Sequence, residues 1–215
     1  MRKLLRITAY LITGFVLIIT LLGLLLWQKP ELAANAYNSL RPLMIADGGK
    51  RCLQKLYEKG VEFEPLLEYG SEMCVVKNPV LVSAFSETAL SSPVVLNCSF
   101  AEKVDTWLVE SDVRRVEHLG TYNCRNIAGT GILSEHSFGA AIDISAIDGA
   151  SVLKNWSGPP ERQQILKSAV SKACAYFFNV LTPDSNAAHA DHLHLDRGLG
   201  LGCIRFLGFP PRRAN

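Results

Sequence analysis

The chain has 215 residues, 48% of them hydrophobic, with 22 basic and 20 acidic side chains and a formal net charge of +2. This length suits one ordinary domain with additional segments. Three of the bases lie in the first 28 residues, which hold no acid, so 19 bases oppose 20 acids in the remainder. Because that remainder has no basic stripe, we expect no nucleic-acid partner.

An uncharged apolar run extends from Ile7 to Trp27 near the N-terminus. About 20 such residues form a helix long enough to cross the ~30 Å hydrocarbon layer of a membrane. The three bases before the run place the N-terminus in the cytoplasm and the rest of the chain outside, by the positive-inside rule. Residues 1–28 are therefore expected to be an uncleaved single-pass anchor. The alternative is a signal peptide cleaved at the small-residue motif Ala34-Asn35-Ala36.

Residues 29–50 form a mixed, weakly patterned stretch with two prolines and a Gly48-Gly49 break, which predicts a linker. The globular domain is then expected over residues 51–215. Short helices and short strands are interspersed in it without the regular rhythm of a parallel sheet. This arrangement predicts an α+β fold, an antiparallel sheet with flanking helices.

Apolar periodicity and caps place the elements along the domain. Helices are expected over 52–57, from a capping box at Ser99-x-x-Glu102 through Leu108, and over 163–178. Strands are expected over 61–64, 73–76, 94–96, 114–119, 141–145 and 192–196. Period-two alternation puts Ile142 and Ile144 on the core face and Asp143 on the opposite face.

Six cysteines follow the apolar run, at positions 52, 74, 98, 124, 174 and 203. An even number of cysteines outside the membrane predicts up to three disulfides, although the sequence alone does not choose the pairing. We expect sequential pairs, Cys52–Cys74, Cys98–Cys124 and Cys174–Cys203. The chain has no Cys-x-x-Cys pair, so a cysteine zinc site is not expected.

Four of the five histidines lie in two short stretches, Ser134–Asp143 and His189–Asp196. In the second stretch, His192 and His194 are two residues apart. A strand then presents both imidazoles on one face and sends the leucines between them into the core. The fifth histidine, His118, stands alone and is expected to be structural or exposed.

A metal ion is the simplest reason for directing two imidazoles to one place. Zinc accepts histidine nitrogen and carboxylate oxygen at about 2.0–2.2 Å, and catalytic zinc sites use three protein ligands and a water. His136 and Asp143 offer such donors from the first stretch. The sequence therefore predicts one zinc site closed by both stretches. A purely structural zinc is the alternative, but structural sites usually rely on cysteine.

These motifs carry a resemblance to known families. Residues 134–143 read Ser-x-His-x-x-Gly-x-Ala-x-Asp, and with the following His-x-His they resemble the signature of zinc D-alanyl-D-alanine peptidases, murein endopeptidases and the hedgehog fold. Together with Tyr122-Asn123-Cys124-Arg125, the second histidine stretch and Cys203, residues 51–205 resemble more closely the bacterial extensin-like C-terminal domain family. The resemblance implies a hedgehog/DD-peptidase-like sheet with flanking helices.

The same resemblance implies roles for particular residues. His136, Asp143 and His194 correspond to zinc ligands, and His192 corresponds to an acid/base or transition-state residue. His189 matches a further histidine of the murein endopeptidases.

Three roles stay open in this comparison. The carboxypeptidases have a Glu-x-x-His arrangement where this chain has no glutamate, so the general base is open among His189, His192 and Asp191. Arg125 is a candidate for holding a substrate carboxylate or a developing oxyanion, with a structural or surface role as the alternative. Ser134 either contacts a ligand or caps a loop.

The expected function is that of a zinc metallopeptidase in the bacterial inner membrane, with its C-terminal domain in the periplasm. Its substrate is expected to be a peptidoglycan stem peptide or cross-link, cut as an endopeptidase or carboxypeptidase at a D,D or L,D amide bond. An envelope-spanning machine is a possible partner. The alternative is a non-catalytic zinc module that binds the cell wall or an envelope partner.

Overall fold

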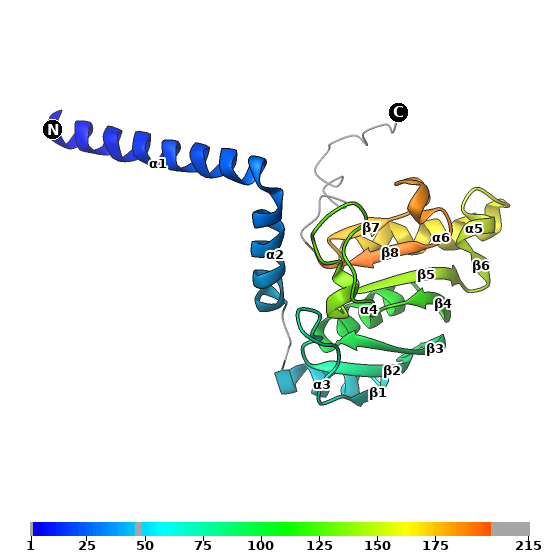
Figure 1. Ribbon diagram of the computed structural model, residues 1–215. Helices are drawn as coiled ribbons and strands as arrows, with labels where there is room; N and C mark the ends of the chain where they lie inside the picture. The colour runs from blue at the N-terminus through cyan, green and yellow to red at the C-terminus, as the bar shows by residue number, and fades with distance from the viewer. Residues whose placement is uncertain (1, 46–48, 199–215) are drawn as a thin grey trace.

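One eight-stranded sheet organises the domain in the computed structural model, which describes residues 2–45 and 49–198 (Figure 1). The strand order is β1-β2-β3-β4-β5-β8-β7, and β6 pairs with β5. The strands are β1 (Glu62–Pro65), β2 (Pro79–Phe85), β3 (Thr88–Asn97), β4 (Arg115–Gly120), β5 (Ala141–Ile147), β6 (Ala150–Ser151), β7 (Asn179–Leu181) and β8 (Leu193–Asp196).

The sheet is mixed rather than purely antiparallel. β3 and β4 are parallel, whereas the other strand pairs in the described part of the chain are antiparallel. The parallel pair arises because α4 (Cys98–Glu110) connects the end of β3 to the start of β4, and such a crossover returns the chain in the same direction. The expected α+β class is confirmed, and the expected all-antiparallel sheet is corrected at this one pair.

Helices cover one face of the sheet, and Figure 1 shows α4 and α6 behind it. The helices are α1 (Arg2–Gln28), α2 (Pro30–Met44), α3 (Gly49–Glu58), α4, α5 (Val152–Asn155) and α6 (Pro160–Ala173), with short 3-10 turns η1 (Glu135–Phe138) and η2 (Ala187–His189). The indole Nε1 of Trp107 donates to the Ala169 carbonyl at 3.0 Å and joins α4 to α6. The main core lies between these helices and the sheet.

The pairing of β5 with β8 fixes which side chains face away from this core. Ile142 lies opposite Leu195, and Asp143 lies opposite His194. Both apolar partners are fully buried in the core under the helices. Successive side chains of a strand alternate between faces, so the polar pair lies on the other face. A slip of one residue would reverse this arrangement, and burial of the apolar face therefore specifies the register.

α1 contains the expected apolar segment. Residues Tyr10–Gln28 have a mean hydropathy of 2.4 and none of this window is buried, so the helix is long and apolar enough to cross a membrane. Lys29 alone separates α1 from α2, which begins at Pro30. Proline suits the first turn of a helix, because its fixed φ is helical and its missing N–H has no partner there in any case.

Residues 30–44 are a docked helix, in contrast to the linker expected there. Ala34, Asn38 and Arg41 are buried at helical spacing on one side of α2, and Ile45 follows on the same side. The Asn38 side chain donates to the Gly131 carbonyl at 2.8 Å and accepts the Leu133 N–H at 2.8 Å. The helix therefore packs on the loop that precedes η1.

Two expected elements differ in detail. Residues 73–76 do not form a strand, because the Cys74 and Val76 N–H groups donate to Ser71 and Tyr69 in local turns. α4 begins at Cys98 rather than after Ser99, since the Asn97 side chain caps it by accepting the Phe100 N–H at 3.2 Å. The other expected helices and strands correspond to observed elements, although α6 ends at Ala173 instead of 178.

The expected sequential disulfides are wrong for the two pairs that the structure describes. Cys52 is bonded to Cys98 and Cys74 to Cys124. The first bond follows from packing, because α3 lies against α4 and buries both sulfurs. The second joins two loops beside the smaller apolar cluster. The third expected pair includes Cys203, which lies outside the described residues.

Candidate metal centre

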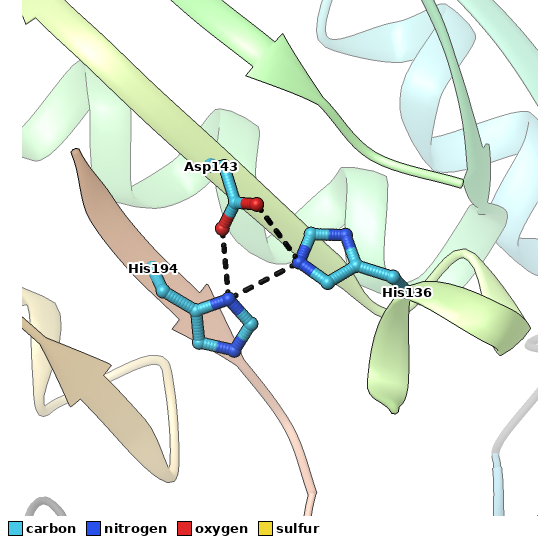
Figure 2. Close-up of side chains that lie close together, drawn as sticks. All are labelled: His136, Asp143 and His194. Carbon is cyan, nitrogen blue, oxygen red and sulfur yellow. Dashed lines mark hydrogen bonds and ion pairs between the residues drawn. The ribbon is translucent and has the colours of Figure 1, made fainter. Parts of the chain in front are cut away.

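Three side chains from different elements converge at one point (Figure 2). His136 Nε2 lies 3.2 Å from an Asp143 carboxylate oxygen and 3.2 Å from His194 Nδ1. His194 Nδ1 lies 2.8 Å from the other Asp143 oxygen. η1 supplies His136, while the paired strands β5 and β8 supply the other two. All three ligand atoms lie within 4.8 Å of one another, so they could hold one metal ion.

A short capped turn aims His136 at the two strands. Ser134 Oγ accepts the His136 N–H at 3.4 Å, which gives Ser134 the loop-capping role. Gly139 ends η1 with φ at 60°, in the left-handed region. A Cβ added there would lie 2.9 Å from both the Asn97 nitrogen and Val76 Cγ1, so the close approach also requires glycine.

The remaining imidazole nitrogens of the two histidines are held by acceptors. His136 Nδ1 donates to the Thr121 carbonyl at 2.7 Å, and His194 Nε2 donates to the Asp196 carboxylate at 2.7 Å. Asp196 is itself fixed by the Asn179 amide at 2.8 Å and the Gly198 N–H at 2.7 Å. Such contacts orient metal-binding histidines in proteins, because the outer N–H bond leaves the inner nitrogen as a lone-pair donor.

The three inner groups need a positive charge between them. With the outer N–H bonds in place, both inner nitrogens and the Asp143 carboxylate present lone pairs 2.8–3.2 Å apart, an arrangement that repels unless a proton or cation intervenes. A tetrahedral ion with bonds of about 2.1 Å separates its ligands by about 3.4 Å. The observed distances approach this value, so the residues fit a metal ion after a small expansion.

In the metal-free protein a proton supplies that charge. Burial works against ionisation of Asp143, but the neighbouring His136 and His194 imidazoles hold the pKa of that carboxyl well below its usual range. Burial also works against a charged His194, yet its hydrogen bonds with Asp143 and Asp196 raise the pKa of the imidazole to about 9. The proton on His194 therefore occupies the place that a metal would take.

Because a proton on His194 takes the place of the metal, the metal-free protein is expected to have a pH dependence of stability that the zinc-loaded protein lacks. The raised pKa of His194 contributes stability in full below its ordinary pKa of 6.5, and this contribution is lost as the pH rises to about 9. We expect the free energy of unfolding to fall by roughly 3 kcal/mol over this interval in chelator-treated protein. Urea unfolding at pH 6.5 and at pH 9 measures this change, with zinc-loaded protein as the control. An equal change in the free energy of unfolding in the metal-free and zinc-loaded proteins would contradict the assignment.

Two further histidines lie beside the triad of His136, Asp143 and His194. His192 Nδ1 donates to the Asp191 carboxylate at 2.8 Å, which leaves Nε2 as an acceptor 3.6 Å from Asp143. His189 Nδ1 donates to the Asn186 side-chain oxygen at 2.7 Å, and its ring lies 5.1 Å from that of His192. Burial, together with the neighbouring His194 and His192, lowers the pKa of His189 to about 4. His189 is therefore neutral near pH 7. His192 differs from it in having a carboxylate as the partner of its Nδ1.

A cleft of about 410 Å³ lies over the triad and contains most of the residues expected from the sequence. His136 itself is only 2% exposed and contacts the cleft residues Asp143 and His194 from the buried side. Arg125 lines the cleft, and its guanidinium donates a long hydrogen bond of 3.5 Å to the Asn126 carbonyl. Asp143, His189, His192 and His194 line it as well. His118 lies on β4, outside both clusters, and its Nε2 contacts the Ser92 carbonyl of β3 at 2.9 Å.

The sequence interpretation missed residues that adjoin this cleft. Tyr37 of α2 lines the cleft, and Arg41 of the same helix pairs with Glu135, which precedes His136. The helical spacing of the buried positions 34, 38, 41 and 45 is the sequence signal that could have revealed this helix. The contact of His136 with the Thr121 carbonyl has no such signal, because it uses the backbone.

Comparison with known proteins identifies a family for this region. A family model described as "Extensin-like protein C-terminus" matches residues 50–203. The searches of curated proteins and of solved structures returned no match. The matched region includes every residue of the triad and both neighbouring histidines.

Proposed function

We propose that this chain, which belongs to the extensin-like protein C-terminus family, is a membrane-anchored zinc-dependent hydrolase of amide bonds in peptidoglycan. The observation that carries the proposal is a three-ligand cluster of which Asp143 and His194 line an open cleft, with the acceptor nitrogen of His192 beside it. A structural zinc site is closed by four protein ligands and needs no nearby base. Three ligands, an open side and an imidazole are the requirements of hydrolysis.

The metal and its ligands have a limited part in this scheme. Bound zinc supplies Lewis-acid chemistry, lowering the pKa of water toward about 7 and polarising a carbonyl. His136, Asp143 and His194 would hold the ion. The Thr121 carbonyl and Asp196 keep the two imidazoles in the required tautomers and orientations.

Proton transfer is assigned to His192. Its Nε2 faces the cluster as an acceptor, and it takes a proton from the attacking water and returns one to the leaving amine. Asp191 supports this step because its carboxylate stabilises the imidazolium that forms. His189 stays neutral, and its Nε2 is available to accept a hydrogen bond from substrate. Arg125 can receive a substrate carboxylate or a developing oxyanion.

Location and substrate follow from the anchor. α1 suits a bacterial inner membrane, with the cleft on the periplasmic side where peptidoglycan lies. Retention of the anchor is supported by α2, because the alternative cleavage motif contains Ala34, which is buried against the domain. The histidine and aspartate arrangement on a sheet supports a hedgehog/DD-peptidase-like fold. An endopeptidase is the form we favour, and an envelope-spanning machine is a fitting partner.

Digestion of purified peptidoglycan by the full chain in detergent tests this function. We expect new amino and carboxyl termini in the released peptides by mass spectrometry, loss of this activity after chelation, and recovery with one equivalent of zinc. The masses of the products identify the bond that is cut. A zinc-loaded protein that binds wall fragments without cutting them would instead establish the binding module.

A further inference from the structure

The juxtamembrane helix α2 contributes directly to the cleft over the triad. Tyr37 lines the cleft, and its hydroxyl donates to Glu135 Oε1 at 3.1 Å. Glu135 lines the same cleft and immediately precedes His136 in η1. α2 lies outside the residues matched by the family model, which begin at residue 50. This side of the cleft therefore comes from outside the matched region.

A buried ion pair holds α2 in this position. Arg41 Nε donates to Glu135 Oε1 at 2.6 Å, and Nη2 donates to the second carboxylate oxygen, so the contact is bidentate. Both side chains are only 6% exposed. Arg41 Nη2 also donates to the Arg197 carbonyl at 3.0 Å, just after β8. Together with the two Asn38 hydrogen bonds, these contacts join α2 to η1, to the loop before it and to the residue that follows β8.

We propose that α2 is a wall of the substrate cleft and that Tyr37 contacts the bound peptide. This inference rests on the proposed function. The opposite parts of the cleft are rich in imidazole, carboxylate and guanidinium groups, so a half-buried tyrosine ring supplies a flat apolar surface among them. Such a ring packs well against the alkyl side chains and backbone of a short peptide. The Arg41–Glu135 pair acts as a positioning device for this ring.

Steady-state kinetics on three full-length variants test the contact with Tyr37. With soluble disaccharide-peptide fragments of bacterial peptidoglycan, we expect Tyr37→Ala to raise KM about tenfold, with kcat within about twofold of wild type. Tyr37→Phe keeps the ring and should raise KM by less than about threefold. Tyr57→Ala removes a tyrosine of α3 that is 76% exposed and should change neither constant.

Zinc content separates a substrate contact from a structural role. All three variants should keep the wild-type amount of zinc per chain. An unchanged KM in Tyr37→Ala would overturn the proposal, and so would a loss of zinc together with kcat.

If the wild type cuts none of these fragments, the proposed hydrolysis is wrong, but the contact of Tyr37 with a bound peptide can still be tested. The contact between Tyr37 and the peptide is then tested by calorimetric titration of the same fragments into zinc-loaded protein. A tenfold weaker affinity in Tyr37→Ala supports the contact, and equal affinity or no binding refutes it.

Discussion

Replacement of His136 by alanine is expected to remove zinc from the protein. His136 is one of three ligands, and its Nε2 is the inner donor that η1 directs at Asp143 and His194. Loss of contacts to a ligand costs about 10–100-fold in metal affinity, and loss of the ligand itself costs more. Wild-type protein should contain about one zinc per chain by metal analysis, and His136→Ala should contain almost none after dialysis.

His118→Ala is the matched control for this experiment. It removes a histidine of β4 that contacts Ser92, away from the cluster. Its zinc content should equal that of the wild type, and circular dichroism should show that all three proteins are folded. If His136→Ala retained its zinc, the ion would have to be bound elsewhere, and the assignment of the site would be wrong.

Replacement of His192 by alanine is expected to abolish hydrolysis while zinc stays bound. His192 is not one of the three clustered ligands, but its acceptor nitrogen faces them, and the Asp191 carboxylate accepts its Nδ1–H and fixes the tautomer. General acid–base groups contribute about 10²–10⁴-fold to a rate, so kcat should fall by that amount. The fall should appear in kcat more than in KM, because proton transfer occurs in the transition state.

His189 provides the comparison that separates proton transfer from binding. Its pKa of about 4 keeps it neutral and makes it a weak base, so His189→Ala should lose less kcat than His192→Ala. A His192→Ala protein that holds zinc and keeps a kcat within tenfold of wild type would exclude His192 as the general base. The same result with a strong loss in His189→Ala would transfer the role to His189.

The parts of the fold that follow from local periodicity were predictable. Alternation of Ile142 and Ile144 with Asp143 requires only that one face of a strand be buried, and the same holds for His194 between Leu193 and Leu195. These two strands supply two groups of the triad. The sequence therefore located the candidate site well, although it did not establish what the site binds.

The parts that depend on long-range packing were not predictable. Arg41 and Glu135 are 94 residues apart, and neither signals the other in the sequence. The disulfide pairs follow from how α3 meets α4 and how two loops meet, not from the order of the cysteines. Asn97 caps α4 because its side chain accepts the Phe100 N–H. The sequence pattern favoured Ser99 as the cap, because Ser99 and Glu102 match a capping box.

The central claim is that His136, Asp143 and His194 together bind one zinc ion. The most direct measurement is anomalous diffraction from crystals of the purified protein, recorded on both sides of the zinc absorption edge. We predict a single strong peak within about 2.0–2.2 Å of His136 Nε2, an Asp143 oxygen and His194 Nδ1. A zinc-saturated crystal with no peak there, or with its peak at other residues, would contradict the account.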